Sequence, residues 1–212
     1  MQGIGKAITA VAALGAVGGI SIGSYYALNN SQNIKGRLEE EKFTVLTSSS
    51  ALIDWTAVLN KYKQEQTNTF TGKADAGNNV NEDYLQSKCS KILNNKSDDT
   101  NNYKLAKRWC VKEETINAIL QKRGYTVLST TEAKSEEVPA WEANLKELQK
   151  DTNKFKAIKD NINKIQKSEN ITALKEGCNL LQTGTIKTTD GKFEENIKLA
   201  SQWCSSKKKD GK

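Results

Sequence analysis

The sequence contains no histidine, one proline and only three arginines, Arg37, Arg108 and Arg123. Without histidine, neither a Ser-His-Asp triad nor a Cys-His pair can be built, so these two kinds of nucleophilic catalysis are excluded. The glycine patterns of nucleotide-binding loops and the GxSxG motif are absent as well. The sequence therefore predicts a protein that is not an enzyme and holds no cofactor.

Apolar residues are also scarce. They make up 36% of the 212 residues, the mean hydropathy is −0.67, and the first 28 residues contain many of them. The remaining chain is long enough for one ordinary domain or two small ones with a thin core, which helical pairs and small bundles tolerate. Lysine accounts for 29 of the 32 basic residues, and asparagine is abundant. This bias is typical of AT-rich genomes and makes the net charge of +7 a weak indicator of function.

The charge pattern predicts no specific nucleic-acid binding. The 25 acidic residues are interleaved with the lysines, and no basic motif with interleaved aromatic residues occurs. The one dense basic cluster, Lys207–Lys209, is typical of a solvated tail.

Acidic clusters are the remaining candidates for catalysis or metal binding. Glu39–Glu41 or Glu136–Glu137 could in principle act on a glycosidic bond, but clustered glutamates in polar stretches are usually a solvated face. The segment Asp75–Asp83 is rich in oxygen ligands, yet its glycine is misplaced for an EF-hand. The sequence therefore predicts neither catalytic residues nor a metal site.

Residues 7–28 form an uncharged run of 22 residues that follows Lys6. A helix of this length spans about 30 Å, the thickness of the hydrocarbon core of a bilayer. The Tyr25–Tyr26 pair at its far end suits the headgroup region. The run predicts an uncleaved membrane anchor over residues 1–28. The alternatives are a cleaved signal peptide, with Ser21–Gly23 as a passable cleavage site, and a buried soluble helix.

Three glycines in this run, Gly15, Gly19 and Gly23, repeat every fourth residue. The spacing is typical of helix pairs in membranes and would allow a homodimer, although glycine is frequent in membrane helices generally. Flanking charges do not decide the orientation of the anchor, because basic residues occur on both sides of the run.

The rest of the chain indicates an internal duplication. Blocks of the first half recur in the same order in the second half, at an offset that grows from 82 to 94 residues. We therefore predict a mainly α fold: an N-terminal transmembrane helix over 1–28, one divergent helical repeat over 29–112, and a second over 113–212 with a basic C-terminal tail. The matched blocks are Phe43–Leu46 with Tyr125–Leu128, Trp55–Leu59 with Trp141–Leu145, Leu85–Ile92 with Leu174–Leu181, and Lys104–Cys110 with Lys198–Cys204.

Apolar spacing places three helices in each repeat. A stripe over Leu52–Tyr62 predicts one helix, and its counterpart in the second repeat is longer, with Pro139 in its first turn and a stripe to Ile165. Gly124 and Gly184 are typical helix stops. The blocks at 43–46 and 125–128 are either short extended segments or tight connectors. Four tryptophans on or beside the helical stripes are predicted to pack in the core: Trp55, Trp109, Trp141 and Trp203.

Four cysteines occupy equivalent places, two in each repeat, which predicts the disulfides Cys89–Cys110 and Cys178–Cys204. Each would join the second helix of a repeat to the third and add roughly 3–4 kcal/mol of stability on the chain-entropy model. A zinc or redox site is disfavoured because there is no CxxC pair and no histidine. Buried free thiols are the other alternative. Disulfides persist in oxidising spaces, so they favour a domain outside the cell.

Several features together resemble the paralogous uncharacterised membrane-anchored surface proteins of hemotropic mycoplasmas. They are the opening MQGIGKAITAVAALGAVGGISIGSYY, the blocks KLAKRWC and KLASQWC, the segment YTVLS, and the lysine- and asparagine-rich composition without histidine. The resemblance covers nearly the whole chain, but no motif in it is diagnostic of an activity. It implies a surface-exposed, antigenically varying protein of a wall-less bacterium attached to erythrocytes, and it carries over no functional residue.

The sequence thus favours a non-enzymatic, single-pass protein of the cell membrane with an extracellular helical domain. Its partners would be the membrane and a host surface or an antibody, and its role host-cell contact or antigenic variation. The alternative is an intracellular, membrane-tethered scaffold whose long helix over 139–167 pairs with a partner.

Overall fold

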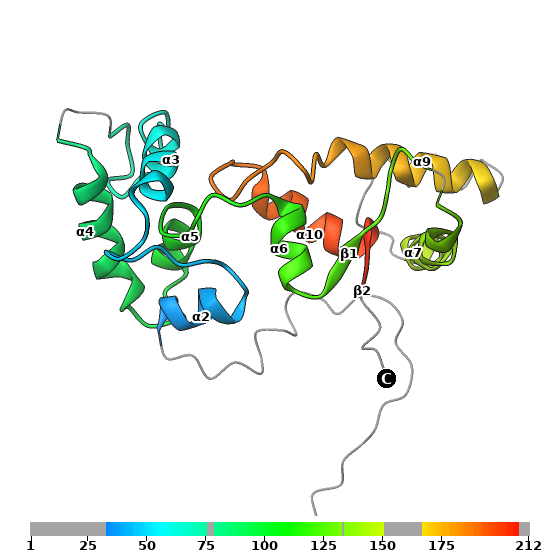
Figure 1. Ribbon diagram of the computed structural model, residues 1–212, viewed down its shortest axis with the longest axis horizontal. Helices are drawn as coiled ribbons and strands as arrows, with labels where there is room; N and C mark the ends of the chain where they lie inside the picture. The colour runs from blue at the N-terminus through cyan, green and yellow to red at the C-terminus, as the bar shows by residue number, and fades with distance from the viewer. Residues whose placement is uncertain (1–32, 76–78, 133, 151–166, 208–212) are drawn as a thin grey trace, which may run out of the picture.

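The computed structural model describes residues 33–75, 79–132, 134–150 and 167–207. The chain is mainly α-helical, as predicted, with one small sheet in these ranges (Figure 1). The helices are α2 (Ile34–Glu40), α3 (Leu52–Tyr62), α4 (Glu82–Leu93), α5 (Thr100–Trp109), α6 (Ile116–Lys122), α7 (Val138–Lys150), α9 (Lys167–Leu180) and α10 (Phe193–Trp203), with a 3₁₀ turn η2 (Ser135–Glu137) and strands β1 (Tyr125–Val127) and β2 (Ser205–Lys207).

Some predicted features lie outside the described residues. They are the anchor over 1–28 with its three spaced glycines, the stripe beyond Lys150 that leads to Ile165, and the last two lysines of the 207–209 cluster. Within the ranges that the structure describes, no helix has both the length and the apolar character needed to cross a membrane.

Four helices begin with a polar side chain that caps the first turn. Asn33, Asn81, Asp99 and Thr115 precede α2, α4, α5 and α6, and each accepts a hydrogen bond from the backbone N–H three residues further on. These caps satisfy donors that have no partner within the helix. Helix α3 differs, because Ala51 at its start offers no side-chain acceptor.

The helix ends follow the glycine prediction in one case only. Gly124 has a φ of +78° directly after α6, which confirms the predicted stop. The prediction for Gly184 is wrong, because α9 ends at Leu180. Tight turns end this helix, since the N–H groups of Leu181 and Gln182 donate to carbonyls three residues back. Gln182, with a φ of +48°, takes the left-handed conformation instead.

In the first half, α4 packs against α5, α3 packs against α4, and α2 contacts both α4 and α5 (Figure 1). Val45 forms an isolated antiparallel bridge with Val111. The N–H of Leu46 donates to the carbonyl of Cys110 at 2.9 Å. The 43–46 block is therefore extended along the chain that leaves α5.

In the second half, α10 contacts α6, α7 and α9. Strand β1 pairs antiparallel with β2, with Tyr125 opposite Lys207. The N–H of Leu128 donates to the carbonyl of Cys204 at 2.9 Å. The 125–128 block is therefore a strand and its continuation. The prediction that Lys207 belongs to a solvated tail is wrong, because Lys207 is the last residue of β2 and pairs with Tyr125 of β1.

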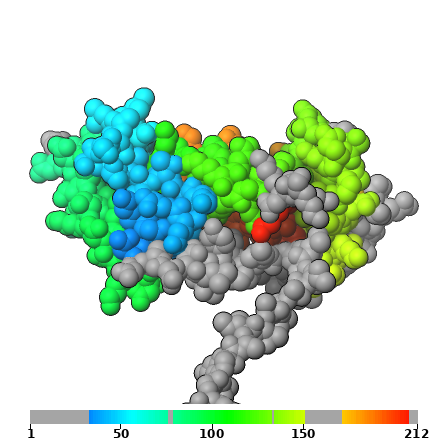
Figure 2. All heavy atoms as spheres, turned by 60° about the horizontal axis from the view of Figure 1, so that its bottom comes forward, coloured from blue at the N-terminus to red at the C-terminus, as the bar shows by residue number. Residues whose placement is uncertain are grey.

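Buried apolar side chains of both halves form one connected core. The rings of Phe43 and Phe193 lie 6.2 Å apart between centroids, where the first half meets α10. The N–H of Thr188 donates to the carbonyl of Glu114 at 3.0 Å, and Arg108 Nε donates to the carbonyl of Thr189 at 2.9 Å. Figure 2 shows the green surface of α6 between the blue-to-cyan first half and the yellow-green surface of α7.

A buried carboxylate, Glu41, lies where α2, α5 and α6 meet. Its side chain is only 3% exposed, and both carboxylate oxygens accept from the hydroxyl of Tyr103 at 2.6 Å. Three cations surround it: Arg37 at 3.3 Å, Lys107 at 3.7 Å and Arg123 at 3.9 Å. The prediction of a solvated glutamate face is therefore wrong for Glu41, because these groups offset the cost of removing its charge from water.

The same cluster reaches α10. Lys107, only 8% exposed at its side chain, also contacts Glu194 of that helix at 2.6 Å. Arg123 donates through Nε to the backbone carbonyl of Glu41 at 2.9 Å. One buried charge thus joins helices from both halves of the chain.

We expect Glu41→Gln to lower the free energy of unfolding by about 2–4 kcal/mol, because three cations would lose the charge that compensates them. Urea denaturation of the wild type and the variant measures the difference. The matched control is Glu39→Gln, whose ion pair with Lys35 is about half exposed, and we expect it to change stability by less than about 0.5 kcal/mol. Equal effects of the two substitutions would contradict the assigned role of Glu41.

Candidate functional site

All four cysteines form disulfide bonds, in the predicted pairs Cys89–Cys110 and Cys178–Cys204. In each pair the first cysteine lies within a helix, α4 or α9. The second is the residue that ends the next helix, α5 or α10. The alternatives of buried free thiols and a metal site do not apply to bonded sulfur atoms.

The four predicted core tryptophans are all buried, with exposed fractions of 1% for Trp55, Trp109 and Trp141 and 5% for Trp203. Their indole N–H groups differ between the halves. Trp55 donates to the carbonyl of Thr47 at 3.1 Å, and Trp109 donates to the carbonyl of Asn68 at 2.6 Å. Among the described residues, no acceptor faces the buried Nε1 atoms of Trp141 and Trp203.

The loop that supplies the acceptor for Trp109 is held by Glu65. Its carboxylate accepts from the N–H groups of Gln66, Thr67 and Asn68 and contacts Arg108 at 2.5 Å. Burial acts to raise the pKa of Glu65, but the donated N–H groups and the charge of Arg108 outweigh it and lower the pKa to about 2. This carboxylate is therefore ionised at any physiological pH.

The acidic 75–83 segment begins with a carboxylate that tyrosines hold. Asp75 Oδ2 accepts from the hydroxyls of Tyr62, at 3.0 Å, and Tyr84, at 2.5 Å. Burial and this contact with Asp75 raise the pKa of both phenols. No group of three or more metal-ligating side chains occurs in the part of the chain that the structure describes.

The other predicted glutamate cluster is also part of the fold. Glu137 accepts from the N–H of Ser129 at 2.7 Å, and its side chain is 13% exposed. The prediction of a solvated face is therefore wrong for this residue. Its carboxylate holds the chain that continues from β1.

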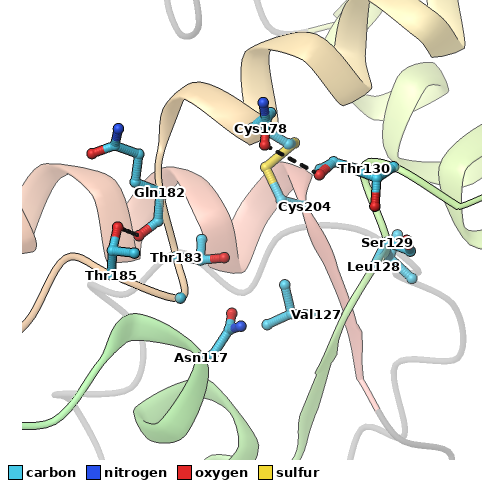
Figure 3. A pocket seen from close by; sticks show the side chains of 13 residues that line it. Asn117, Val127, Leu128, Ser129, Thr130, Cys178, Gln182, Thr183, Thr185 and Cys204 are labelled. Carbon is cyan, nitrogen blue, oxygen red and sulfur yellow. Dashed lines mark hydrogen bonds between the residues drawn. A yellow bond between two sulfur atoms is a disulfide. The ribbon is translucent and has the colours of Figure 1, made fainter.

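A cavity of about 490 Å³ opens beside the second disulfide. Its walls come from the start of α6, the chain over 127–131, the C-terminal end of α9 and the turn over 182–185. Both Cys178 and Cys204 line it. Figure 3 shows Thr183 of the turn near Asn117 of α6 and Val127 of β1, with the disulfide above them in this view.

The polar groups in this lining are hydroxyls and amides. Thr130 Oγ1 donates to Asn179 Oδ1 at 3.4 Å, and Thr185 Oγ1 donates to the carbonyl of Gln182 at 3.2 Å. Asn117 Oδ1 is buried and accepts no hydrogen bond from any residue in the described ranges. Among the lining residues identified in those ranges, none is charged. The cavity can therefore exchange hydrogen bonds with a neutral polar molecule.

Sequence reasoning did not find this cavity. Its lining comes from residues 117, 127–131, 178–179, 182–185 and 204, which lie far apart in the chain, and its serines, threonines and amides follow no motif. The nearby cysteine pair is the one sequence signal in this region, and it predicts where the chain is cross-linked but not that a cavity lies beside the bond.

Comparison of the chain with protein-family models, with curated proteins and with solved structures finds no match. The residues and geometry of the cavity are therefore the basis for inferring what it binds.

We expect the double variant Cys89→Ser/Cys110→Ser to lower the free energy of unfolding by roughly 3–4 kcal/mol, because the unfolded chain regains the freedom of a 21-residue loop. Thermal unfolding followed by circular dichroism measures the loss. The matched control is Ser87→Ala, an exposed position on the same helix, and it should leave the transition within about 0.5 kcal/mol. A double variant as stable as the control would contradict a stabilising disulfide.

We expect acid to remove the stabilisation that Glu65 provides. Its pKa is lowered in the folded protein, so its contribution is complete above the ordinary glutamate value of 4.5 and is lost as pH falls toward about 2. The difference in unfolding free energy between the wild type and Glu65→Gln should therefore shrink between pH 5 and pH 2. The exposed Glu176→Gln is the control. A difference that stays constant over this range would rule out the assigned ionisation.

Proposed function

We propose that the protein is a non-enzymatic, membrane-anchored surface protein that presents a disulfide-bonded helical domain outside the cell. The observation that carries the proposal is the pair of buried disulfides, Cys89–Cys110 and Cys178–Cys204. Such bonds form and persist in oxidising spaces and are rare in the reducing cytosol of ordinary cells. The described domain therefore fits the outer side of a membrane better than the inner side.

The anchor is the second element of the proposal. It rests on the uncharged run at 7–28, which is long enough to cross a bilayer as a helix. Because the charges on its two flanks do not decide the orientation, the disulfides supply that argument. An extracellular domain after an N-terminal anchor places the amino terminus inside the cell.

We infer that the helical domain arose by duplication. Lys42 and Gly124, which lie 82 residues apart, both have a positive φ after the first helix of their half. The Leu46 to Cys110 hydrogen bond has a counterpart in the bond from Leu128 to Cys204. These positions follow the offsets of the matched sequence blocks, which supports two divergent repeats over 29–112 and 113–212.

The biological role that this arrangement supports is contact with a host surface or antigenic variation. The resemblance to surface proteins of hemotropic mycoplasmas motivates this role, and the framework suits it. Two disulfides and one core fix the backbone, while the exposed polar positions are free to vary. The partners would be host-cell molecules and antibodies.

We expect protease added to intact cells to remove the helical domain and to leave a short fragment that carries the anchor. The readout is an immunoblot with one tag at each end of the chain. A cytoplasmic marker protein is the control for cell integrity and should stay whole. Full protection of the domain would show an intracellular position and favour the membrane-tethered scaffold.

A thiol count separates the same two locations independently. Protein denatured with a thiol-reactive reagent directly from cells, without reductant, should gain no label at any of its four cysteines. After reduction it should gain four. Labelling of all four without reductant would contradict the oxidising location.

A further inference from the structure

The described residues that line the cavity beside Cys178–Cys204 are all neutral. Charged residues make up 27% of the sequence, so a lining of 13 residues at the protein surface would hold roughly three or four of them. The described lining holds none. Its volume of about 490 Å³ is within the usual range for ligand pockets, roughly 300–1,000 Å³.

The polar groups that remain can both donate and accept hydrogen bonds. The hydroxyls of Ser129, Thr130 and Thr183 do so by rotation, and the amides of Asn117 and Asn179 do so with separate atoms. The Oδ1 atom of Asn117 is buried and has no donor among the described residues, whereas its Nδ2 atom faces Gly184 in the lining and can donate to a ligand. An anion would need cationic or clustered N–H donors, and a cation would need carboxylates. The lining residues that the structure describes therefore suit a neutral ligand with several hydroxyl groups.

An extended peptide is a weaker fit to the same walls. A peptide strand binds by adding to free backbone donors and acceptors at a sheet edge. Here Val127 is paired with Ser205 of β2, and the N–H of Leu128 already donates to Cys204. What the walls offer instead is side-chain hydroxyls and amides around a small apolar surface from Val127 and the disulfide. This combination matches the alternating polar and C–H faces of a sugar ring.

We propose that this cavity binds a neutral saccharide, to which Asn117 donates a hydrogen bond through Nδ2. The site belongs to the second half and uses the second disulfide as a rigid wall. Its use as a contact with glycans of a host cell rests on the surface location proposed above. Binding by purified protein does not depend on that location, so failure of one proposal is distinguishable from failure of the other.

Gly184 provides a way to fill the cavity. It is a lining residue, and a Cβ placed on it would meet only Asn117 Nδ2, at an ordinary contact distance of 3.8 Å. Its backbone does not need a glycine, because it lacks the positive φ seen at Gly124. The longer side chain of Gly184→Leu should therefore extend toward Asn117 and occupy the ligand space. Gly191 is the matched control, because a Cβ there meets nothing within 4 Å.

The test is ligand-observed saturation-transfer NMR on the full-length protein, kept in a detergent without a sugar headgroup. The probes are galactose, glucose, N-acetylglucosamine, N-acetylgalactosamine, fucose and lactose, with sialic acid and a neutral extended hexapeptide as comparison ligands. We expect saturable binding of at least one neutral saccharide with a Kd on the order of 1 mM. Gly184→Leu and Asn117→Ala should each weaken it at least tenfold, and Gly191→Leu should change it less than twofold.

The outcomes decide the proposal. Circular dichroism and a non-reducing peptide map test whether Gly184→Leu folds like the wild type. If it does not, the binding of Asn117→Ala is compared with that of the wild type instead. No saturable binding of any neutral saccharide overturns the site. So does tighter binding of sialic acid or the hexapeptide, and so does equal loss of binding in Gly191→Leu.

Discussion

A disulfide at the end of the last helix fixes three elements at once in each half of this protein. Cys110 and Cys204 each bond to the preceding helix through sulfur and accept a hydrogen bond from an extended segment through their carbonyl, at 2.9 Å in both cases. The bond therefore holds two helices and the chain that comes before them. In a protein with few apolar residues, this covalent constraint replaces part of the stability that a larger core would supply.

Ion pairs of the three arginines add to the constraint that the disulfides place on the fold. The chain has only three arginines, and each lies at an internal contact: Arg37 and Arg123 beside Glu41, and Arg108 between Glu65 and Thr189. Arginine suits these places because its planar guanidinium donates in several directions and loses less on leaving water than lysine does. In a chain whose other 29 basic residues are lysines, all three arginines therefore lie where a planar donor meets a carboxylate and a backbone carbonyl.

The features that sequence predicted well are those set by spacing. The cysteine pairs and the four tryptophans recur at matching places on helical stripes, so periodicity alone brings them to one face. Glu41 could not be placed this way, because nothing in the run Glu39–Glu41 distinguishes it from its neighbours. Its burial depends on Tyr103, Lys107 and Arg123, which come from distant parts of the chain. The cavity escaped prediction for the same reason, since tertiary packing alone assembles its hydroxyls and amides.

The two halves of the chain differ in the polar groups that the described residues leave unpaired. Under the proposed duplication, the residue that corresponds to Asn117 in the first half is Lys35, an ion-paired surface residue. The first half also satisfies the indole N–H groups of Trp55 and Trp109, whereas those of Trp141 and Trp203 have no acceptor in the described ranges. Unsatisfied buried donors cost stability. The first half thus has the features of a completed structural unit, and the second keeps unpaired polar atoms and a neutral cavity. The Cys178–Cys204 disulfide lies along the cavity wall. It offsets part of the stability lost to the unpaired polar atoms and fixes the shape that a ligand would recognise.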